Sequence, residues 1–146
     1  MTIRAFHQED FQQILDIYAN SKLDELIFEK NKFTLIPLDQ DPKRLKAFKA
    51  SQVFVYEEGG ISGYLAIDNA EISSLFVHAN HRGKGIGAAL LNFALRKIQD
   101  NASLHVVSSN TPAKKLYLKQ GFKKVEVFVA QYNGLDVQVD KMIHQG

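Results

Sequence analysis

Three glycines within five residues, Gly83, Gly85 and Gly87, stand between a predicted strand and a predicted amphipathic helix. Glycine permits positive φ angles and lets a ligand approach the backbone closely. The start of the helix behind them presents unpaired N–H groups and the positive end of the helix dipole, which together bind anions. Arg82 and Lys84 add two cations beside this turn. One glycine would suffice to turn a strand into a helix, so this combination predicts a phosphate-binding turn.

Two well-known phosphate-binding patterns do not fit this turn. A P-loop requires Ser or Thr directly after its lysine, whereas Lys84 is followed by Gly85. Gly83-x-Gly85-x-x-Ala88 matches the loose dinucleotide-binding fingerprint, but that fold also needs an acidic residue at the end of the next strand. The next strand ends in Val107-Ser108-Ser109-Asn110, and the turn follows hairpin-linked strands rather than the first strand of a βαβ repeat. Both readings are therefore rejected.

Serine nucleophiles and metal sites are also disfavoured. Gly60-Ile61-Ser62-Gly63 resembles a nucleophile elbow, but Tyr64 stands where that motif requires a second glycine. His78 and His81 form no HExxH motif and have no nearby carboxylate at ligand spacing, so we expect no metal. The chain has no cysteine, so it also has no thiolate nucleophile.

The elements that must position the turn begin with a set of strands. Alternating or β-rich runs predict them over residues 2–6, 53–57, 61–67, 70–78, 103–107, 122–132 and 135–143. Glu58-Gly59-Gly60, Asp68-Asn69 and Asn133-Gly134 are turn signals that link consecutive strands as hairpins.

Four helices are predicted between or before these strands. They begin at Asp10, at Asp41-Pro42, behind the glycine turn and at Thr111-Pro112, because Asp and Pro favour helix starts. The last helix ends at Gly121, which is well placed as its C-terminal cap. Residues 22–38 read as a short helix plus a loop. Without repeats or linker-like segments, the chain is expected to form one mixed α/β (α+β) domain over residues 1–146.

Composition narrows the class of protein. A hydrophobic fraction of 45% and a charged fraction of 23% are typical of globular chains and argue against global disorder. No apolar run or N-terminal signal predicts membrane insertion or export, and the lack of cysteine suits a reducing cytoplasm. The net charge is only +2, and a loose basic group at Lys114, Lys115, Lys119, Lys123 and Lys124 is expected to be a solvated face. We therefore expect neither a nucleic-acid nor a membrane partner.

Two consecutive motifs carry a family resemblance. Arg82-x-x-Gly85-x-Gly87 is followed by a strand over 104–107 and then by Asn110-x-x-Ala113-x-x-Leu116-Tyr117-x-x-x-Gly121-Phe122. Together they resemble the GNAT N-acetyltransferase superfamily, whose pyrophosphate motif is Arg/Gln-x-x-Gly-x-Gly/Ala. The order of elements from Thr2 to Ile143 is also similar, most weakly between Lys22 and Gln52. The resemblance is closest to small stand-alone bacterial members.

This resemblance implies a mixed, mostly antiparallel sheet of six to seven strands, flanked by helices, with a splayed central strand pair that holds acetyl-CoA. The main chain of Leu75, Phe76 and Val77 would pair with the pantetheine arm, while their side chains pack in the core. The implied pyrophosphate cradle is Arg82, Gly83, Lys84, Gly85, Ile86, Gly87 and Ala88. Asn110 and Ala113 would contact the cofactor from the next strand end and helix, although Asn110 also suits a helix N-cap.

Two residues are the implied catalytic candidates. Tyr117 corresponds to the tyrosine that protonates the departing CoA thiolate in many family members, and its alternative role is packing under the sheet. Glu71, on the strand before the glycine turn, corresponds to the base of some relatives. Period-two alternation would place Ser73 and Leu75 on its face. A carboxylate beside an apolar sheet suits a base, but Glu71 also lies near a turn and could be solvated.

The resulting hypothesis is a cytoplasmic acetyl-CoA-dependent N-acetyltransferase, monomeric or homodimeric, that needs no metal. Because the chain has no cysteine and no nucleophile-elbow serine, a covalent acyl-enzyme lacks an obvious nucleophile, and direct transfer in a ternary complex is the better mechanism. Its acceptor would be a small amine, an amino acid or a peptide, lying against residues 18–38 and the Tyr132-Asn133-Gly134 turn. Phe28, Phe33 and Tyr132 are candidate walls there. The alternative is an acyl-CoA-binding regulatory module that has kept the pocket and lost turnover.

Overall fold

The computed structural model describes residues 2–145, which form a seven-stranded sheet and four α-helices. The strands are β1 (Thr2–Ala5), β2 (Gln52–Glu57), β3 (Ile61–Asp68), β4 (Glu71–Val77), β5 (Ala102–Val107), β6 (Phe122–Tyr132) and β7 (Leu135–His144). The helices are α1 (Phe11–Ser21), α2 (Pro42–Ala50), α3 (Ile86–Lys97) and α4 (Thr111–Lys119). Four 3-10 turns complete the order: η1 (Gln8–Asp10), η2 (Lys22–Leu26), η3 (Leu38–Gln40) and η4 (Ala79–His81). The predicted mixed α/β, mostly antiparallel fold is confirmed.

The sheet order is β1-β2-β3-β4-β5-β7-β6. Strands β4 and β5 pair in parallel, whereas the other neighbouring strands pair antiparallel. The parallel pair is short: Glu71 lies opposite Ser103 and Ile72 opposite Leu104, after which the two strands have no further partners on this side. β4 nevertheless continues to Val77 and β5 to Val107. The predicted splay of the central strands is therefore present, and it opens beyond Ile72.

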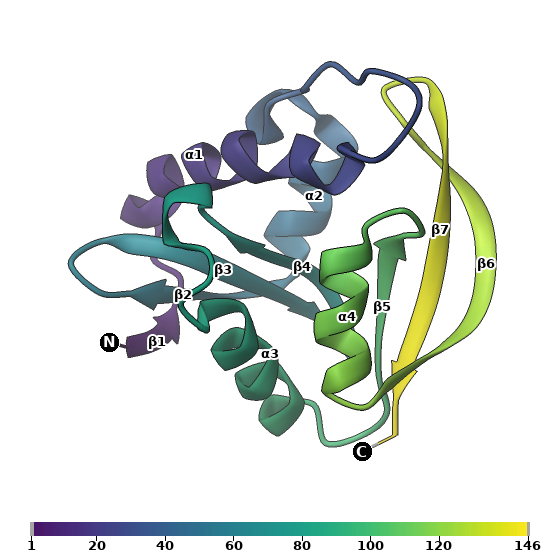
Figure 1. Cartoon of the computed structure of the whole chain (residues 1–146). Coiled ribbons are helices and arrows are strands. Elements are labelled where there is room, and N and C mark those ends of the chain that lie inside the picture. Colours follow the sequence, from purple (N-terminus) through teal and green to yellow (C-terminus); the bar gives the residue numbers. More distant parts are fainter. Residues whose placement is uncertain (1, 146) are drawn as a thin grey trace.

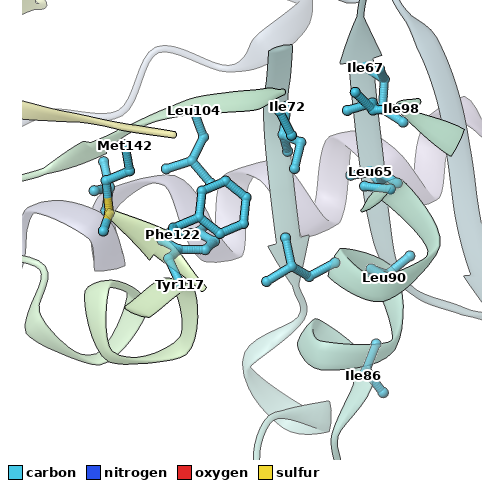
Figure 2. Packing of buried hydrophobic residues seen from close by; sticks show 14 of the residues in the cluster. Leu65, Ile67, Ile72, Ile86, Leu90, Ile98, Leu104, Tyr117, Phe122 and Met142 are labelled. Atoms are coloured by element: carbon cyan, nitrogen blue, oxygen red, sulfur yellow. The ribbon is translucent and has the colours of Figure 1, made fainter. Parts of the chain in front are cut away.

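Helices cover both faces of the sheet, with α1 and α2 on one face and α3 and α4 on the other (Figure 1). On the α3–α4 face, Leu65, Ile72, Leu90, Leu104 and Phe122 form the centre of a buried cluster (Figure 2). On the α1–α2 face, buried residues of both helices pack on β2 and β3; they include Ile14, Ile17, Tyr18, Phe48, Val55 and Tyr64. The α3–α4 cluster includes Ile72 of β4 and Leu104 of β5, so it holds together the two strands that border the splay.

A bulge in β4 overturns one expectation about side-chain direction. The β3–β4 register shifts between Ala66 and Ile67, so Ser73 is the extra residue on β4. Ile72 and Leu75 consequently pack on the α3–α4 face, whereas Phe76 packs on the α1–α2 face. The prediction that Leu75 shares a face with Glu71 is thus wrong, because regular alternation fails at the bulge.

The helix starts follow the expected signals with one exception. Asp41 caps α2 by accepting a 3.3 Å hydrogen bond from the Arg44 N–H. Asp10 precedes α1 but makes no side-chain cap to it. Its carboxylate instead accepts hydrogen bonds from Arg4 and from the His7 N–H, and the Arg4 bonds hold the pKa of Asp10 below its usual value. Asp10 therefore links β1 to the start of α1 through a part-buried ion pair with Arg4.

Candidate active site

A cleft of about 980 Å³ occupies the splay between β4 and β5 and continues between η2, α2 and the β6–β7 hairpin. Nearly all the predicted site residues line it: Glu71, Leu75, Phe76, Val77, Arg82, Gly83, Gly85, Ile86, Gly87, Asn110, Ala113 and Tyr117. Lys84 and Ala88 do not, although both belong to the glycine turn or to the first turn of α3. Residues from both predicted motifs therefore meet in one cavity.

The glycine turn has the geometry of an anion cradle. Gly83 and Gly85 have φ angles of +77° and +82°, and a Cβ on either would meet open space. Gly85 is the N-cap of α3 and carries no capping side chain, and within residues 2–145 the N–H groups of Ile86, Gly87 and Ala88 find no backbone acceptor. These free donors, at the positive end of the helix dipole, fit a diphosphate.

Arg82 is held in place by groups on two elements. Its Nε donates to the Val77 carbonyl over 3.0 Å, and its guanidinium forms an ion pair with Asp24 of η2. Both members of the ion pair are more than 40% exposed. An anion that enters the turn must compete with Asp24 for this guanidinium.

We expect Asp24→Asn to bind CoA roughly two- to fivefold more tightly, because the variant removes that competitor and an exposed ion pair is worth little. Calorimetric titration with CoA at fixed ionic strength measures the change. Asp16→Asn is the matched control, since Asp16 is exposed on α1 and does not line the cleft. Unchanged or weaker binding in Asp24→Asn would show that Arg82 does not contact the ligand.

The far end of the splay offers further groups that have no protein partner. Asn110 is the N-cap of α4, yet its side chain makes no capping hydrogen bond. The alternative of a structural cap is therefore not realised, and the amide faces the cleft beside Ala113. On the opposite wall, β4 stays paired with β3 as far as Val77, but on its β5 side it has no strand partner beyond Ile72 among residues 2–145. Both features suit a ligand that hydrogen-bonds to amide groups.

Tyr117 lies between the core and the cleft. Its ring packs edge-on against Phe122 in the cluster shown in Figure 2, with centroids 5.8 Å apart. Burial raises the pKa of the Tyr117 hydroxyl above its usual value, so the group stays protonated. No residue between 2 and 145 hydrogen-bonds to this hydroxyl. The two roles weighed for Tyr117, packing and contact with a ligand, are compatible.

A buried carboxylate anchors the helix that carries Asn110 and Tyr117. Asp140 of β7 accepts from Ser108 over 2.5 Å and pairs with Lys114 of α4 over 2.7 Å. Burial acts to raise the pKa of Asp140, but the bonds from Lys114 and Ser108 outweigh it and hold the pKa below its usual value. Lys114 thus departs from the solvated face expected for its basic group. The sequence did not predict the Lys114–Asp140 ion pair, because the two residues lie far apart in the chain.

Glu71 has a neighbour that the sequence reading missed. His105 of β5 places its Nδ1 3.9 Å from the Glu71 carboxylate, and its ring packs edge-on on Phe128. Both side chains are 44% exposed and both line the cleft. Leu104 and Val106, on either side of His105, are buried. Because side chains alternate along a strand, the sequence could have predicted that His105 points to the opposite face of the sheet.

The outer wall of the cleft joins distant segments. The chain between η2 and η3 reaches the tip of the β6–β7 hairpin (Figure 1), where the Tyr132 hydroxyl accepts from the Ile36 N–H over 2.9 Å. Tyr132 and Phe28 line the cleft, as expected. Phe33 does not line the cleft; its ring packs against the Tyr132 ring at a tilt, with the centroids 6.3 Å apart.

Two absences concern the described part of the chain. Residues 2–145 contain no group of three or more His, Asp or Glu side chains arranged to hold a metal ion. None of the helices in the same range combines the length and apolar character that crossing a bilayer requires.

Comparison with known proteins agrees with this geometry. The acetyltransferase (GNAT) domain family matches residues 49–124. UPF0157 protein YqkA of Bacillus subtilis (strain 168) is 43% identical over 61 residues, which cover 40% of this chain and only 18% of that protein. A GCN5-related N-acetyltransferase structure from Rhodopseudomonas palustris superposes with a TM-score of 0.80 at 15% identity, covering 99% of this chain and 95% of that one.

A second structure matches with a bound cofactor. A putative acetyltransferase from Salmonella typhimurium, solved with its cofactor acetyl-CoA, superposes with a TM-score of 0.72 at 24% identity. The match covers 99% of this chain and 93% of that one. Identities this low establish a shared fold, whereas the family match spans more than half of the chain and covers both motifs as far as Phe122.

Proposed function

Since this chain belongs to the acetyltransferase (GNAT) family, we propose that it transfers the acetyl group of acetyl-CoA directly to a primary amine in a ternary complex. The observation that carries the proposal is the meeting of the glycine turn, Tyr117 and Glu71 in one continuous cleft. A transferase of this kind needs an anion cradle, a donor for the leaving group and a proton acceptor. The cleft supplies candidates for all three.

In this proposal the turn from Arg82 to Ala88 binds the pyrophosphate through backbone N–H groups. Arg82 exchanges Asp24 for a phosphate oxygen, and Lys84 adds charge from outside the cleft. The main chain of β4 from Leu75 to Val77 and the Asn110 amide bind the pantetheine arm, against the small side chain of Ala113. The positive φ angles of Gly83 and Gly85 and the unpaired helix N–H groups support this assignment.

The chemical step forms an N–C bond and breaks a C–S bond. The free amine attacks the thioester carbonyl carbon, one amine proton passes to Glu71, directly or through water, and the CoA thiolate departs. A thiol has a pKa of about 8.5, so its thiolate needs only modest stabilisation. Tyr117, whose pKa is raised by burial, acts by donating a hydrogen bond to the sulfur rather than by complete proton transfer.

Kinetic order tests the proposal. Initial-rate lines at varied acetyl-CoA and varied acceptor should intersect, because both substrates must occupy the cleft before the acetyl group moves. Without acceptor, slow release of CoA from acetyl-CoA is expected. Parallel lines, or a kinetically competent acetylated protein found by mass spectrometry, would contradict direct transfer. Tight acetyl-CoA binding with no CoA release under any condition would favour the regulatory module instead.

A further inference from the structure

The outer end of the cleft contains a cluster of polar groups that the proposed transfer does not use. We call it the outer cluster: Tyr18, Lys22, Glu25, Arg44 and Tyr132, all of which line the cleft. The Lys22 ammonium and the Arg44 guanidinium lie 5.2 Å and 5.1 Å from the centroid of the same Tyr132 ring. Two cations, one from η2 and one from α2, therefore contact the same tyrosine ring in the wall.

Several of these groups are short of hydrogen-bond partners. Tyr18 is 3% exposed, and its hydroxyl is buried without a partner among residues 2–145. Arg44 approaches Asp41 only through Nε, at 3.3 Å, and its side chain donates no hydrogen bond to any residue in that range. Lys22 is partly neutralised by Glu25 at 3.1 Å. A buried donor without a partner is costly, so the Tyr18 hydroxyl, in the electrostatic neighbourhood of Arg44, indicates a polar ligand.

The charge of the surroundings indicates that this ligand group is an anion. Lys22, Lys43 and Arg44 face the outer end of the cleft, whereas the acidic groups beside them are Glu25 and Asp41. The donors are the Arg44 guanidinium, which approaches Asp41, the Lys22 ammonium, which pairs with Glu25, and the unpartnered Tyr18 hydroxyl. Together they match a carboxylate. At the inner end the charged groups are Glu71 and His105, which suit an amine.

The length of the cleft sets the spacing between these two groups. His105 packs on Phe128, and the outer cluster surrounds Tyr132, four residues further along β6. At about 3.3 Å per residue this separation is roughly 13 Å. We take this strand spacing as the separation of the two sets of binding groups, because each set contacts one of the two rings. A hydrogen-bond reach of about 3 Å at each end then leaves roughly 7 Å between the amine and the anion. An α-amino acid is too short to span this distance.

We infer that the acceptor is a primary amine joined to a carboxylate through a short, mainly apolar spacer, as in an ω-amino acid or a dipeptide. Arg44, Lys22 and the Tyr18 hydroxyl bind its carboxylate, and its amine lies at Glu71 and His105. This inference rests on the proposed function and names its substrate class.

Matched acceptors isolate the contribution of the carboxylate. With saturating acetyl-CoA, 6-aminohexanoate and glycylglycine are each compared with their carboxamides, and 6-aminohexanoate also with pentylamine. We expect kcat/KM to be about tenfold or more higher for at least one carboxylate than for its neutral counterparts, the size of one charge-assisted hydrogen bond. The two carboxylates distinguish an ω-amino acid from a peptide. Equal or better turnover of the neutral amines contradicts the inference.

Two variants and one control assign that preference to the outer cluster. Arg44→Gln should reduce the carboxylate preference to about twofold, whereas Lys49→Gln, an exposed change at the other end of α2, should leave it intact. Tyr18→Phe should reduce it about threefold without lowering the thermal unfolding midpoint, since the lost hydroxyl has no partner. A destabilised Tyr18→Phe with unchanged preference would show that the hydroxyl is only structural.

Product binding separates this inference from the proposed function. Calorimetry on the CoA complex should detect N-acetyl-6-aminohexanoate or N-acetylglycylglycine, and not the corresponding carboxamide. If CoA binds but neither carboxylated product binds and neither carboxylated amine reacts, the inference is wrong while the cofactor site stands. If CoA itself does not bind, the proposed function has failed.

Discussion

Replacing Tyr117 with phenylalanine is expected to lower kcat roughly 10²-fold while leaving CoA affinity within about twofold. The ring packs against Phe122 in the core, and phenylalanine preserves that packing. Only the hydroxyl is lost, and no residue in the described range depends on it for a hydrogen bond. Steady-state rates and CoA calorimetry on the same preparation measure the two effects.

The pH profile separates Tyr117 from Glu71. Because burial raises the Tyr117 pKa, its hydroxyl remains a donor across the accessible range, and the Tyr117→Phe defect should not recover at high pH. Glu71→Gln should depress the rate most near neutral pH and recover partly at high pH, where more acceptor is already free amine. A wild-type profile for Glu71→Gln would assign the base to solvent or to another residue, and His105 is then the next candidate.

Replacing Gly85 with valine is expected to weaken CoA binding by about 10²-fold, the loss of two charge-assisted hydrogen bonds. The φ angle of +82° is strained for a β-branched residue, and the new side chain would enter the open space over the α3 N-terminus. Calorimetry with CoA measures the loss.

Gly59→Val provides a matched control for this backbone strain. Gly59 has a φ of +65° and equally open surroundings, but it lies in the β2–β3 turn away from the cleft. It should lose comparable stability and keep wild-type CoA affinity. Equal CoA binding by wild type and Gly85→Val would exclude the glycine turn as the site.

Local signals made most of the fold predictable. Asn133-Gly134 and Glu58-Gly59-Gly60 specify hairpins through the φ angles that their turns need, and these hairpins fix the neighbouring strands. Asp41 and Pro42 likewise mark the start of α2, because both act within one turn of chain. The glycine turn was readable for the same reason, since its chemistry lies within a few consecutive residues.

Features that depend on register or on distant pairing were not predictable. The bulge at Ser73 arises from the alignment of β3 with β4, and it placed Leu75 on the face opposite to the expected one. His105 reaches Glu71 only because β4 and β5 run parallel in one particular register. Asp24 and Arg82 are likewise brought together by the placement of η2 over the cleft.

The outer cluster was also not predictable from the sequence, because it too depends on contacts between distant segments. Part of it lies in the region where the family resemblance was weakest. Tyr18, Lys22 and Arg44 come from α1, η2 and α2, and each looks like an ordinary helical residue in its own segment. Their common feature is contact with the cavity at Tyr132, which appears only after the hairpin tip is placed against them.

The most direct test of the central claim is a nuclear magnetic resonance titration of the isotopically labelled chain, residues 1–146, with CoA. Binding in the splay should shift the amide signals of residues 82–88, 73–77 and Asn110 together, with one common dissociation constant. The signals of the β2–β3 turn around Gly59 should not move. Unchanged signals at residues 82–88 on saturation with CoA, or shifts confined to other parts of the chain, would contradict acetyl-CoA binding at the glycine turn and the transfer proposed from it.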